Sequence, residues 1–507
     1  MAGIIVRQTC GIDKKSVRKL TLTILLLLFG GSGIALGQTT GGSPASGPSS
    51  GLASPPAYST VRWDENYSYL RDPFNRSDFF DPIKFIPLNS AGDWYLSLGG
   101  QIRDRFEVFN HTNFGGGPQD RDGYNLLRLL AHADVHLGEN FRVFIQGKSA
   151  IESGREGGPR PIDMDTIDLQ QGFGELLLPI GDRASVSIRA GRQELAFGKE
   201  RLIGVVDWTN VERTNDGVRA TFQSPNNVLD LFWVRPVVVE KYEFNDNQGQ
   251  TSFCGIYDTL TVPGSTKARG AHLSLYGLWL NLDGIASYSA SSVAGKGDSN
   301  TYTLGTELTA TAAGFDFDLE ADYQFGDFKG QQISAYSVAT EEGYTFAQAA
   351  FAPRPFIGFD IASGDHDSRN KHIGTFNQLF PTAHPFFGYM DFLGRQNVID
   401  VHPGIELTLL KERRYARSIS VRTEYHQFWR ESTSDATYNT AGGVFRPAGA
   451  GDSSSIGGEL DTLLRWQVDR HLGTYFGYSR FFAGKYLEQT GPSRDVDWFY
   501  AAATYTF

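Results

Sequence analysis

Residues 315–325, FDFDLEADYQF, alternate without interruption between apolar and polar side chains. The odd positions carry Phe, Leu, Ala and Tyr, and the even positions carry Asp, Glu and Gln. Because successive side chains of a β-strand point to opposite faces, the segment predicts a strand with one apolar wall and one acidic wall. A strand of a soluble sandwich can show the same alternation, so the rest of the chain must distinguish a sandwich from a barrel.

The alternation recurs from Trp94 to Phe507, which indicates many strands of one kind. Roughly 16–18 strands of about ten residues fit this length, joined alternately by short turns and long loops. Residues 228–290 also indicate strands, but their pattern does not show which side chains share a face. The clearest segments are 95–109, 127–137, 141–148, 169–177, 186–190, 218–222, 302–308, 398–409, 419–429, 460–468, 472–482 and 498–507.

The last segment, WFYAAATYTF, carries aromatic side chains at alternating positions and ends on Phe507. This ending resembles the assembly signal of bacterial outer-membrane barrels. In a soluble protein an apolar final strand would leave an exposed edge, whereas a barrel removes the edge by pairing the last strand with the first. We therefore expect an all-β fold, a transmembrane antiparallel β-barrel of about 18 strands (16–18) in the bacterial outer membrane, closed by this C-terminal strand.

Composition agrees with half-apolar strands and excludes several other classes. Hydrophobic residues make up only 40% of the chain although aromatics reach 13%, and no stretch beyond the N-terminus has the roughly 20 apolar residues of a spanning helix. The net charge of −11 argues against nucleic acid as a partner. Cys10 and Cys254 are the two cysteines, so the sequence has neither a disulfide framework nor a CxxC metal motif.

Three segments precede the expected barrel, which covers residues 94–507. Basic residues before the apolar run 20–29 and the small residues around Gly37 predict a secretory signal peptide over residues 1–37. Residues 38–57 are rich in Gly, Ser, Pro and Thr and predict a flexible linker. Residues 58–93 mix aromatics, charges and prolines, and we expect them to pack in the periplasmic mouth of the barrel or to form a strap on its surface.

Two stretches and the first strand resemble the alginate export family of outer-membrane barrels. Residues 189–222 contain Gly-Arg-Gln, Trp-x-Asn and Arg-Thr-x-Asp-Gly-Val-Arg in that order, and residues 362–397 contain FNQLFPT, His384 and Gly-Tyr-Met-Asp. The first strand, YLSLGGQIRDRFEVF, fits the family's Gly-Gly-x-x-Arg-x-Arg-x-Glu pattern, whereas Lys199 and Asn215 replace an acid and an aromatic residue. The resemblance implies passive passage of an anionic polysaccharide, an alginate-like polyuronate. Periplasmic polymer-handling proteins are expected partners only if the substrate is a secreted polymer.

A pore for a polyuronate needs several basic sites of moderate strength in series. Arginine suits this task because it is always charged and pairs bidentately with a carboxylate. The alternation and the family pattern assign these basic residues to the expected lumen: Arg103, Arg105, Arg128, Arg142, Lys148, Arg189, Arg192, Arg219, Arg422 and Arg465.

Carboxylates also face the expected lumen. Because the last strand closes on the first, the basic residues should form one arc across the seam, with the carboxylates of residues 316–322 on the opposite wall. We expect a transverse field with anion preference on one side, and pairing of charges within the wall is the alternative. The acidic residues are Glu107, Asp134, Asp316, Asp318, Glu320, Asp322, Glu459 and Asp461.

The segment 364–397 is too long for a turn, so it predicts either an infolded constriction or lid, or a plain extracellular loop. Asp365-His366-Asp367 with Asn370, and Asp163-x-Asp165-x-x-Asp168, space their carboxylates loosely as Ca²⁺ ligands do, but neither completes a calcium loop. We otherwise expect no cofactor and no metal.

No HExxH, P-loop or nucleophile elbow is present, so we do not expect an enzyme. A barrel-embedded hydrolase using His132, His136 and His426 with Asp134 and Glu424 is the remote alternative. The stronger alternative is a general porin for small organic anions or sugars. We expect a monomer whose partners are outer-membrane lipid and the solute that passes.

Overall fold

The computed structural model describes residues 58–59, 61–265, 270–288, 295–367, 369–413, 416–448 and 453–507. The predicted signal peptide and linker, residues 1–57, lie outside this part of the chain. The described residues belong to one compact unit, which begins at Pro55.

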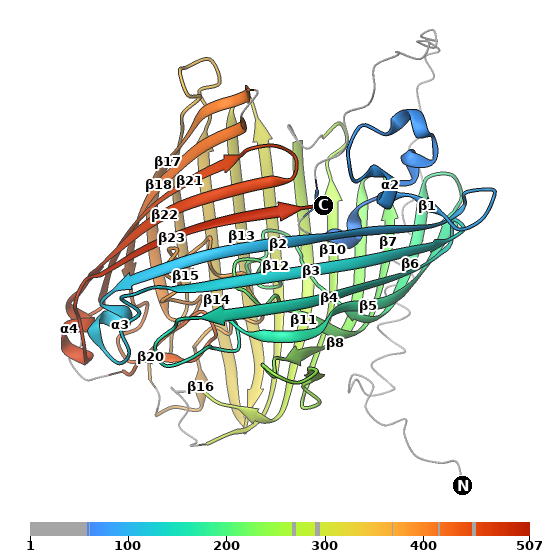
Figure 1. The fold of residues 1–507 in the computed structure, drawn as a ribbon. Helices are drawn as coiled ribbons and strands as arrows, with labels where there is room; N and C mark the ends of the chain where they lie inside the picture. Colours follow the sequence, from blue (N-terminus) through green and yellow to red (C-terminus); the bar gives the residue numbers. More distant parts are fainter. Residues whose placement is uncertain are drawn as a thin grey trace. The chain divides into compact units, whose positions relative to one another are not determined.

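Eighteen long strands in the described part of the chain form a closed antiparallel β-barrel, as the alternation predicted (Figure 1). Each strand pairs with its neighbours along the chain. The strands are β2 (Trp94–Asn110), β3 (Tyr124–Leu137), β4 (Phe141–Ser153), β5 (Asp165–Ile180), β6 (Ala184–Gln193), β7 (Asn215–Ser224), β8 (Asn227–Val238), β10 (Thr251–Thr261), β11 (Gly270–Ala286), β12 (Gly297–Ala312), β13 (Phe315–Phe328), β14 (Gln331–Tyr344), β15 (Arg354–Ala362), β17 (Val398–Arg413), β18 (Ala416–Trp429), β21 (Ser455–Gln467), β22 (Leu472–Ala483) and β23 (Val496–Thr506).

The barrel closes between the first and last long strands. β2 and β23 pair in unbroken register from Gln101 opposite Thr506 to Asn110 opposite Asp497. The backbone N–H of Phe507 donates to the carbonyl oxygen of Gly100 at 3.0 Å, so hydrogen bonding continues to the last residue. The closing strand that the C-terminal aromatic pattern predicted is thus confirmed, and no long strand presents an unpaired edge in the described barrel.

Shorter elements lie in the connections. They are β1 (Ile86–Pro87), β9 (Asp246–Asn247), β16 (His372–Ile373), β19 (Thr437–Tyr438), β20 (Val444–Arg446), α2 (Asp81–Lys84), α3 (Thr112–Gly115), α4 (Lys485–Thr490), and the 3₁₀ turns η1 (Arg62–Asp64), η2 (Ser68–Arg71) and η3 (Pro73–Asn75). None of the helices in the described residues has the length and apolar character needed to cross a bilayer.

The two faces of the barrel differ as the opening segment predicts. On β13, Phe315 and Tyr323 are exposed on the outer surface, whereas Glu320 and Asp322 are buried inside. Asp104 on β2 is exposed between outward apolar neighbours, and the amide of Asn125 donates to it at 3.2 Å. β2 keeps an unbroken register with both neighbouring strands, so Asp104 occupies a regular strand position that faces outward.

The strands between residues 228 and 290 show why their facing could not be inferred from the pattern. Leu231 on β8 points outward and is 49% exposed, whereas Phe232 and Val234 are buried. Phe253 on β10 and Leu278 on β11 are also buried apolar residues of the interior. Both faces are therefore apolar in this part of the wall, because the inner face packs against other protein rather than water.

The N-terminal segment contacts the end of the barrel where the short turns and Phe507 lie. The guanidinium of Arg62 donates to the carbonyl oxygens of Gly100 at 3.0 Å and Phe507 at 3.1 Å. Arg189, an inward residue, stacks over the ring of Trp63 at 3.7 Å from its centroid. Outer-membrane barrels carry short turns on the periplasmic side. These contacts bring Arg62 and Trp63 to the end of the barrel that carries Phe507, and the assignment of the whole segment 58–93 to the periplasmic mouth stays a prediction.

A lysine on the outer surface should destabilise the barrel according to its depth in the membrane. Leu304 lies at the centre of β12 and is 57% exposed on the outside, whereas Ile180 ends β5 and is 50% exposed. We expect Leu304→Lys to lower the free energy of unfolding from lipid vesicles by about 2–4 kcal/mol and Ile180→Lys by about 0–1 kcal/mol. Equal losses in a denaturant titration would contradict this placement of the membrane.

Candidate functional site in the barrel lumen

Two long connections fold into the barrel instead of extending from it. We call residues 194–214, between β6 and β7, the first inner loop, and residues 363–397, between β15 and β17, the second inner loop. Phe197 of the first inner loop stacks on the inward Tyr257 with ring centroids 4.8 Å apart. Phe380 of the second inner loop packs against the inward Phe253, with ring centroids 5.0 Å apart. The part of the predicted segment around Phe380 thus folds inward, as the first alternative predicted, whereas residues 369–372 are exposed and β16 pairs with the start of β14.

The two inner loops are joined to each other by backbone hydrogen bonds. The N–H of Phe380 donates to the carbonyl oxygen of Leu202 at 2.9 Å, and the N–H of Gly204 donates to that of Phe380 at 2.9 Å. The rings of Trp208 and His384 stack with centroids 3.7 Å apart and an angle of 6° between their planes. The loops therefore form one ordered layer inside the lumen.

Three arginines predicted for the substrate path hold the first inner loop. Arg103 donates to the carbonyl oxygens of Asp207 at 2.6 Å and Thr209 at 2.7 Å, and Arg105 donates to that of Trp208. Arg128 donates to the carbonyl oxygen of Asp207 at 3.0 Å and pairs with its carboxylate at 2.5 Å. These guanidinium groups thus bind protein in the structure, not open lumen.

The acidic wall holds the opposite part of the same loop. Arg201 pairs with Asp318 at 2.5 Å and lies 3.5 Å from Glu320. The hydroxyl of Tyr276 donates to Glu320 and Asp322 at 2.8 and 2.7 Å. The first inner loop therefore places the carboxylate of Asp207 against the wall arginines and the guanidinium of Arg201 against the acidic residues of β13. Ion pairs on both sides of the lumen thus hold this loop in place.

Carboxyl groups of the first inner loop have opposite titration tendencies. Burial alone would raise the pKa of Asp207, but the charges of Arg128 and Arg103 lower it below its ordinary value. Burial raises the pKa of Glu194 to about 7, although the amide of Gln170 donates to it at 2.8 Å. Burial also raises the pKa of Glu212 well above its ordinary value. Protonation of Glu194 therefore favours the docked loop.

Most of the other predicted lumen charges pair within the wall. The structure places them inward, and each has a partner of opposite charge on the same strand or on a strand one or two places away. The pairs are Arg142–Glu175 at 2.6 Å, Arg142–Asp134 at 3.6 Å, Arg189–Glu175 at 2.8 Å, Lys148–Asp165 at 3.0 Å, Arg219–Asp230 at 2.7 Å, Arg422–Glu424 at 2.7 Å, Arg105–Glu107 at 2.7 Å and Arg354–Asp316.

Arg192 does not share the face of Arg189. It stands three residues further along β6, opposite Asp216 of β7, on the register that points outward. Its guanidinium pairs with Asp216 at 2.8 Å and donates to the carbonyl oxygen of Asn245 at 3.0 Å. Its assignment to the lumen wall is corrected: Arg192 anchors the connection between β8 and β10.

The predicted acids Glu459 and Asp461 hold the second inner loop. Glu459 accepts a hydrogen bond from the N–H of Met390 at 2.8 Å, and Asp461 accepts one from the N–H of Tyr389 at 3.4 Å. Their strand, β21, also carries Arg465. These carboxylates are therefore positioned to fix a loop rather than to line an open path.

Arg465 differs from the other predicted arginines. It stands opposite Tyr475, whose ring is 5.7 Å from that of Trp208, so it lies on the lumen face. Its side chain is exposed, and within the described residues it has no hydrogen-bond or ion-pair partner. Burial raises the pKa of Tyr389, and the nearby charge of Arg465 partly opposes this effect. Arg465 is thus a free cation beside the inner loops.

Two separate cavities flank the inner loops. One, of about 660 Å³, lies at the turn end and is lined by Glu406, Lys411, Glu412, Arg417, Arg470 and His471 among others. The other, of about 170 Å³, is lined by parts of β11, the second inner loop and residues 438–442. They share no lining residue.

The proposed calcium spacings fall on groups that other residues hold. Asp163 pairs with Arg160 at 2.8 Å, and Asp165 and Asp168 both lie near Lys148. Asp365 accepts a hydrogen bond from the N–H of Gly374 at 2.9 Å. These contacts bind the carboxylates to other parts of the chain, although Oδ1 of Asp165 is buried without a hydrogen-bond partner among the described residues.

The residues of the alternative hydrolase fall into two separate groups, His132, Asp134 and His136 on β3 and Glu424 with His426 on β18. His136 on β3 bonds Asp134 at 3.0 Å, and His132 stacks on Phe144 at 5.3 Å. His426 lies on β18, four strands before β2 around the barrel, and bonds Asp400 at 2.8 Å. The family and fold indicate a channel rather than an enzyme.

Two features of this interior were missed in the sequence. The first inner loop was treated as a motif and not as an infolded segment, although its length and its apolar residues, such as Leu195 and Leu202, were a signal. The sequence does not single out Asp400 and His402, because polar residues at alternating positions are common on any strand that faces a lumen.

Solved structures of Pseudomonas aeruginosa proteins have a similar fold. OccK2 (OpdF) has a TM-score of 0.54 and 10% identity, with 81% of this chain and 97% of that chain covered. OpdO has a TM-score of 0.53 and 12% identity, covering 82% and 97%. OccK2 (OpdF) in complex with glucuronate has a TM-score of 0.52 and 10% identity, covering 81% and 98%. Such identities show the fold alone.

No curated protein sequence matches this chain. The profile of the family described as "Alginate export" matches residues 94–500, which is nearly the whole barrel. With the closed barrel of 18 strands, this match shows that the chain belongs to the alginate export family and is an outer-membrane channel protein of bacteria.

Proposed function

We propose that this channel passes uronate-bearing saccharides passively, with an alginate-like polyuronate as the substrate that its family implies. The observation that carries the proposal is Arg465, an inward guanidinium that no described residue neutralises. A guanidinium binds a carboxylate through two parallel hydrogen bonds, and one exposed site of this kind attracts an anion without trapping it.

The surroundings of Arg465 suit a sugar acid. Trp208, His384 and Tyr389 form a continuous stack, with His384 and Tyr389 centroids 4.9 Å apart. Aromatic rings give a rigid, largely apolar surface for the face of a sugar ring, while Arg465 supplies the partner for its carboxylate. The cavity at the turn end, which also carries bases, provides a vestibule on the periplasmic side.

Small uronates or other organic anions are the second candidate. The inner loops bind each other and both walls, so little lumen is left for a wide polymer while they stay docked. The similar barrel of OccK2 was solved with glucuronate, a single sugar acid. Both candidates need an anion site at Arg465, but they differ in their dependence on chain length.

Arg465→Ala should weaken block of the channel by oligouronates about tenfold, because a hydrogen bond to a charged group contributes about 1.5–3 kcal/mol. The measurement is current block in planar bilayers containing the refolded protein. Arg480→Ala is the matched control, since Arg480 alternates to the outer face and pairs with Asp495 and Asp497. Unchanged block in Arg465→Ala would overturn the anion site.

The same recordings with glucuronate and uronate oligomers of increasing length separate the two candidates. Block that strengthens with length supports a polyuronate path. Block that depends only on uronate concentration favours the small-anion porin, and an outer-membrane channel remains in either case.

Removing the anchors of the first inner loop should open the lumen. We expect Arg103→Ala with Arg128→Ala to raise single-channel conductance severalfold, because the double change leaves the carbonyl groups of Asp207 and Thr209 without their guanidinium donors. Arg354→Gln is the control, since Arg354 pairs with Asp316 and Glu341 in the wall. Equal conductance in the double variant and the control would contradict an occluding loop.

Docking of the first inner loop should weaken as the pH rises. Since the pKa of Glu194 is raised to about 7, its contribution is complete below its ordinary pKa near 4.5 and is lost as the pH passes 7. Asp207 has a lowered pKa and loses its contribution only in stronger acid.

We expect the open probability of the channel to increase between pH 5 and 8, and Glu194→Gln to lose the part of this increase centred near pH 7. The variant also distinguishes the effect of Glu194 on the pH dependence from that of Glu212, because the pKa of Glu212 is raised as well. A wild-type channel whose open probability is flat over this range would refute the role of Glu194.

A further inference from the structure

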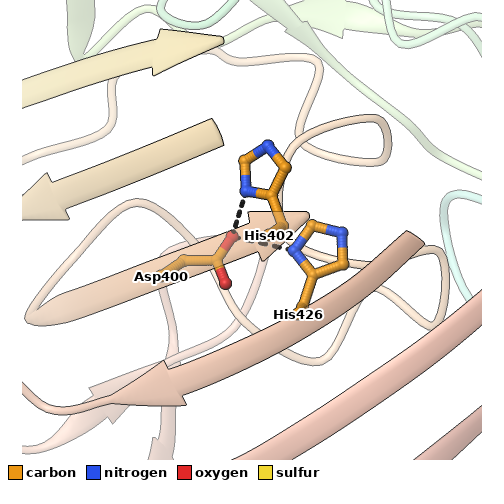
Figure 2. Close-up of side chains that lie close together, drawn as sticks. All are labelled: Asp400, His402 and His426. Atoms are coloured by element: carbon orange, nitrogen blue, oxygen red, sulfur yellow. Dashed lines mark hydrogen bonds and ion pairs between the residues drawn. The ribbon is translucent and has the colours of Figure 1, made fainter. Parts of the chain in front are cut away.

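Asp400, His402 and His426 form a buried group that the channel function does not use (Figure 2). Asp400 and His402 lie on β17, and His426 lies on the adjacent strand β18. Their exposed fractions are 0%, 5% and 1%. In the described residues they are the one group of at least three His, Cys, Asp or Glu side chains with ligand atoms close enough for a metal ion.

The donor atoms converge on one carboxylate. The Nδ1 atoms of His402 and His426 each lie 2.8 Å from the same oxygen, Oδ2 of Asp400, and the two rings stack at 4.6 Å. The ligand atoms of the group all lie within 4.8 Å of one another. Two ligands of one zinc ion lie at most about 4.2 Å apart, so small side-chain rotations are enough.

The carboxylate of Asp400 has more acceptor capacity than the protein uses. Its second oxygen, Oδ1, is buried and has no hydrogen-bond partner among the described residues. A buried carboxylate oxygen without a partner costs free energy, and a pair of imidazole N–H groups on Oδ2 does not satisfy it. A cation held between Asp400 and the two rings would satisfy it.

The neighbouring carboxylates complete the arrangement. Asp360 on β15 stands opposite Asp400, its Oδ2 lies 3.9 Å from Nδ1 of His402, and Arg395 holds it at 2.8 Å. Glu424 lies 3.9 Å from Nε2 of His426. Metal-binding histidines usually have a carboxylate on the side of their second ring nitrogen, which is where Glu424 lies for His426, whereas Asp360 lies on the side of the proposed ligand atom of His402.

We propose that Asp400, His402 and His426 bind one divalent transition-metal ion of the zinc class, with Asp360 in reach as a fourth ligand. Two imidazoles and a carboxylate suit Zn²⁺ and neighbouring first-row ions, not the all-oxygen coordination of Ca²⁺ or Mg²⁺. The Nδ1 atoms bind the ion, and the imidazole proton of each neutral ring moves to Nε2, which for His426 points to Glu424.

The position of this group indicates that a bound ion would stabilise the second inner loop. Asp360 lies two residues before the end of β15, and Asp400 two residues after the start of β17. The second inner loop leaves the wall between these two strands, and its residue Arg395 contacts Asp360. One ion would therefore clamp both stems of the second inner loop to β18.

The competing explanation for this group is that a proton on one of the two histidines, and not a metal ion, balances the charge of the carboxylates. Asp400 and Asp360 carry two negative charges against the one positive charge of Arg395, and a protonated imidazole could balance the remainder as well as a metal ion could. Chelator-treated protein distinguishes them, because only the metal site shows saturable binding of one Zn²⁺ ion per chain.

The experiment compares wild-type protein with His402→Gln/His426→Gln after refolding in detergent and removal of metal with EDTA. Zn²⁺ is titrated by calorimetry, and bound metal is counted after gel filtration. We expect one ion per wild-type chain and a loss of at least 100-fold in affinity in the double variant. His132→Gln is the control, since His132 is a buried lumen histidine of β3 outside this group.

Heat-modifiable migration on gels verifies that each variant forms a barrel. If the double variant fails this check, the single Asp400→Asn variant replaces it, because asparagine keeps the shape of the carboxylate. Wild-type protein that binds no Zn²⁺, or binds it as tightly as a folded variant of the group does, would overturn the metal site.

Discussion

The contacts between three wall arginines and the carbonyl oxygens of Asp207, Trp208 and Thr209 are the interaction on which the interior depends. Inside a barrel these groups are largely shielded from water, so an arginine and a carbonyl group left apart would both be poorly solvated. Bringing the loop to the basic arc satisfies both. Arg201 then reaches the acidic wall from the other end of the loop. The basic and acidic walls, which we expected to attract a solute, therefore bind the first inner loop in the structure.

The fold was largely predictable from the sequence, because a wall with lipid on one side and polar protein or water on the other imposes alternation on every strand. The closing strand followed from its terminal Phe507. The alternation does not show the facing between residues 228 and 290, because the inner face is also apolar there. Phe232 contacts Phe197 of the first inner loop, and Phe253 contacts Phe380 of the second inner loop. When both faces of a strand are apolar, the sequence does not show which face points inward. Only the contacts with the inner loops show it.

The site was predictable only in part. Alternation correctly places residues such as Arg103 and Arg465 inward, but it cannot tell a guanidinium bound by a loop from one left free, because the partner is about a hundred residues away in the chain. The same limit explains the error at Arg192, where a strand position near a loop was judged by motif instead of by register. His426 was considered alone, and its partners Asp400 and His402 became visible only when β17 and β18 were paired.

The backbone bonds between the two inner loops have a mechanical consequence. Phe380 both donates to Leu202 and accepts from Gly204, so neither loop can leave the lumen without breaking the bonds of the other. Each loop is also tied to a different part of the wall, the first to Arg128 and the second to Glu459. The two inner loops therefore form one cooperative unit inside the lumen, and they have to leave it together rather than bend aside one at a time.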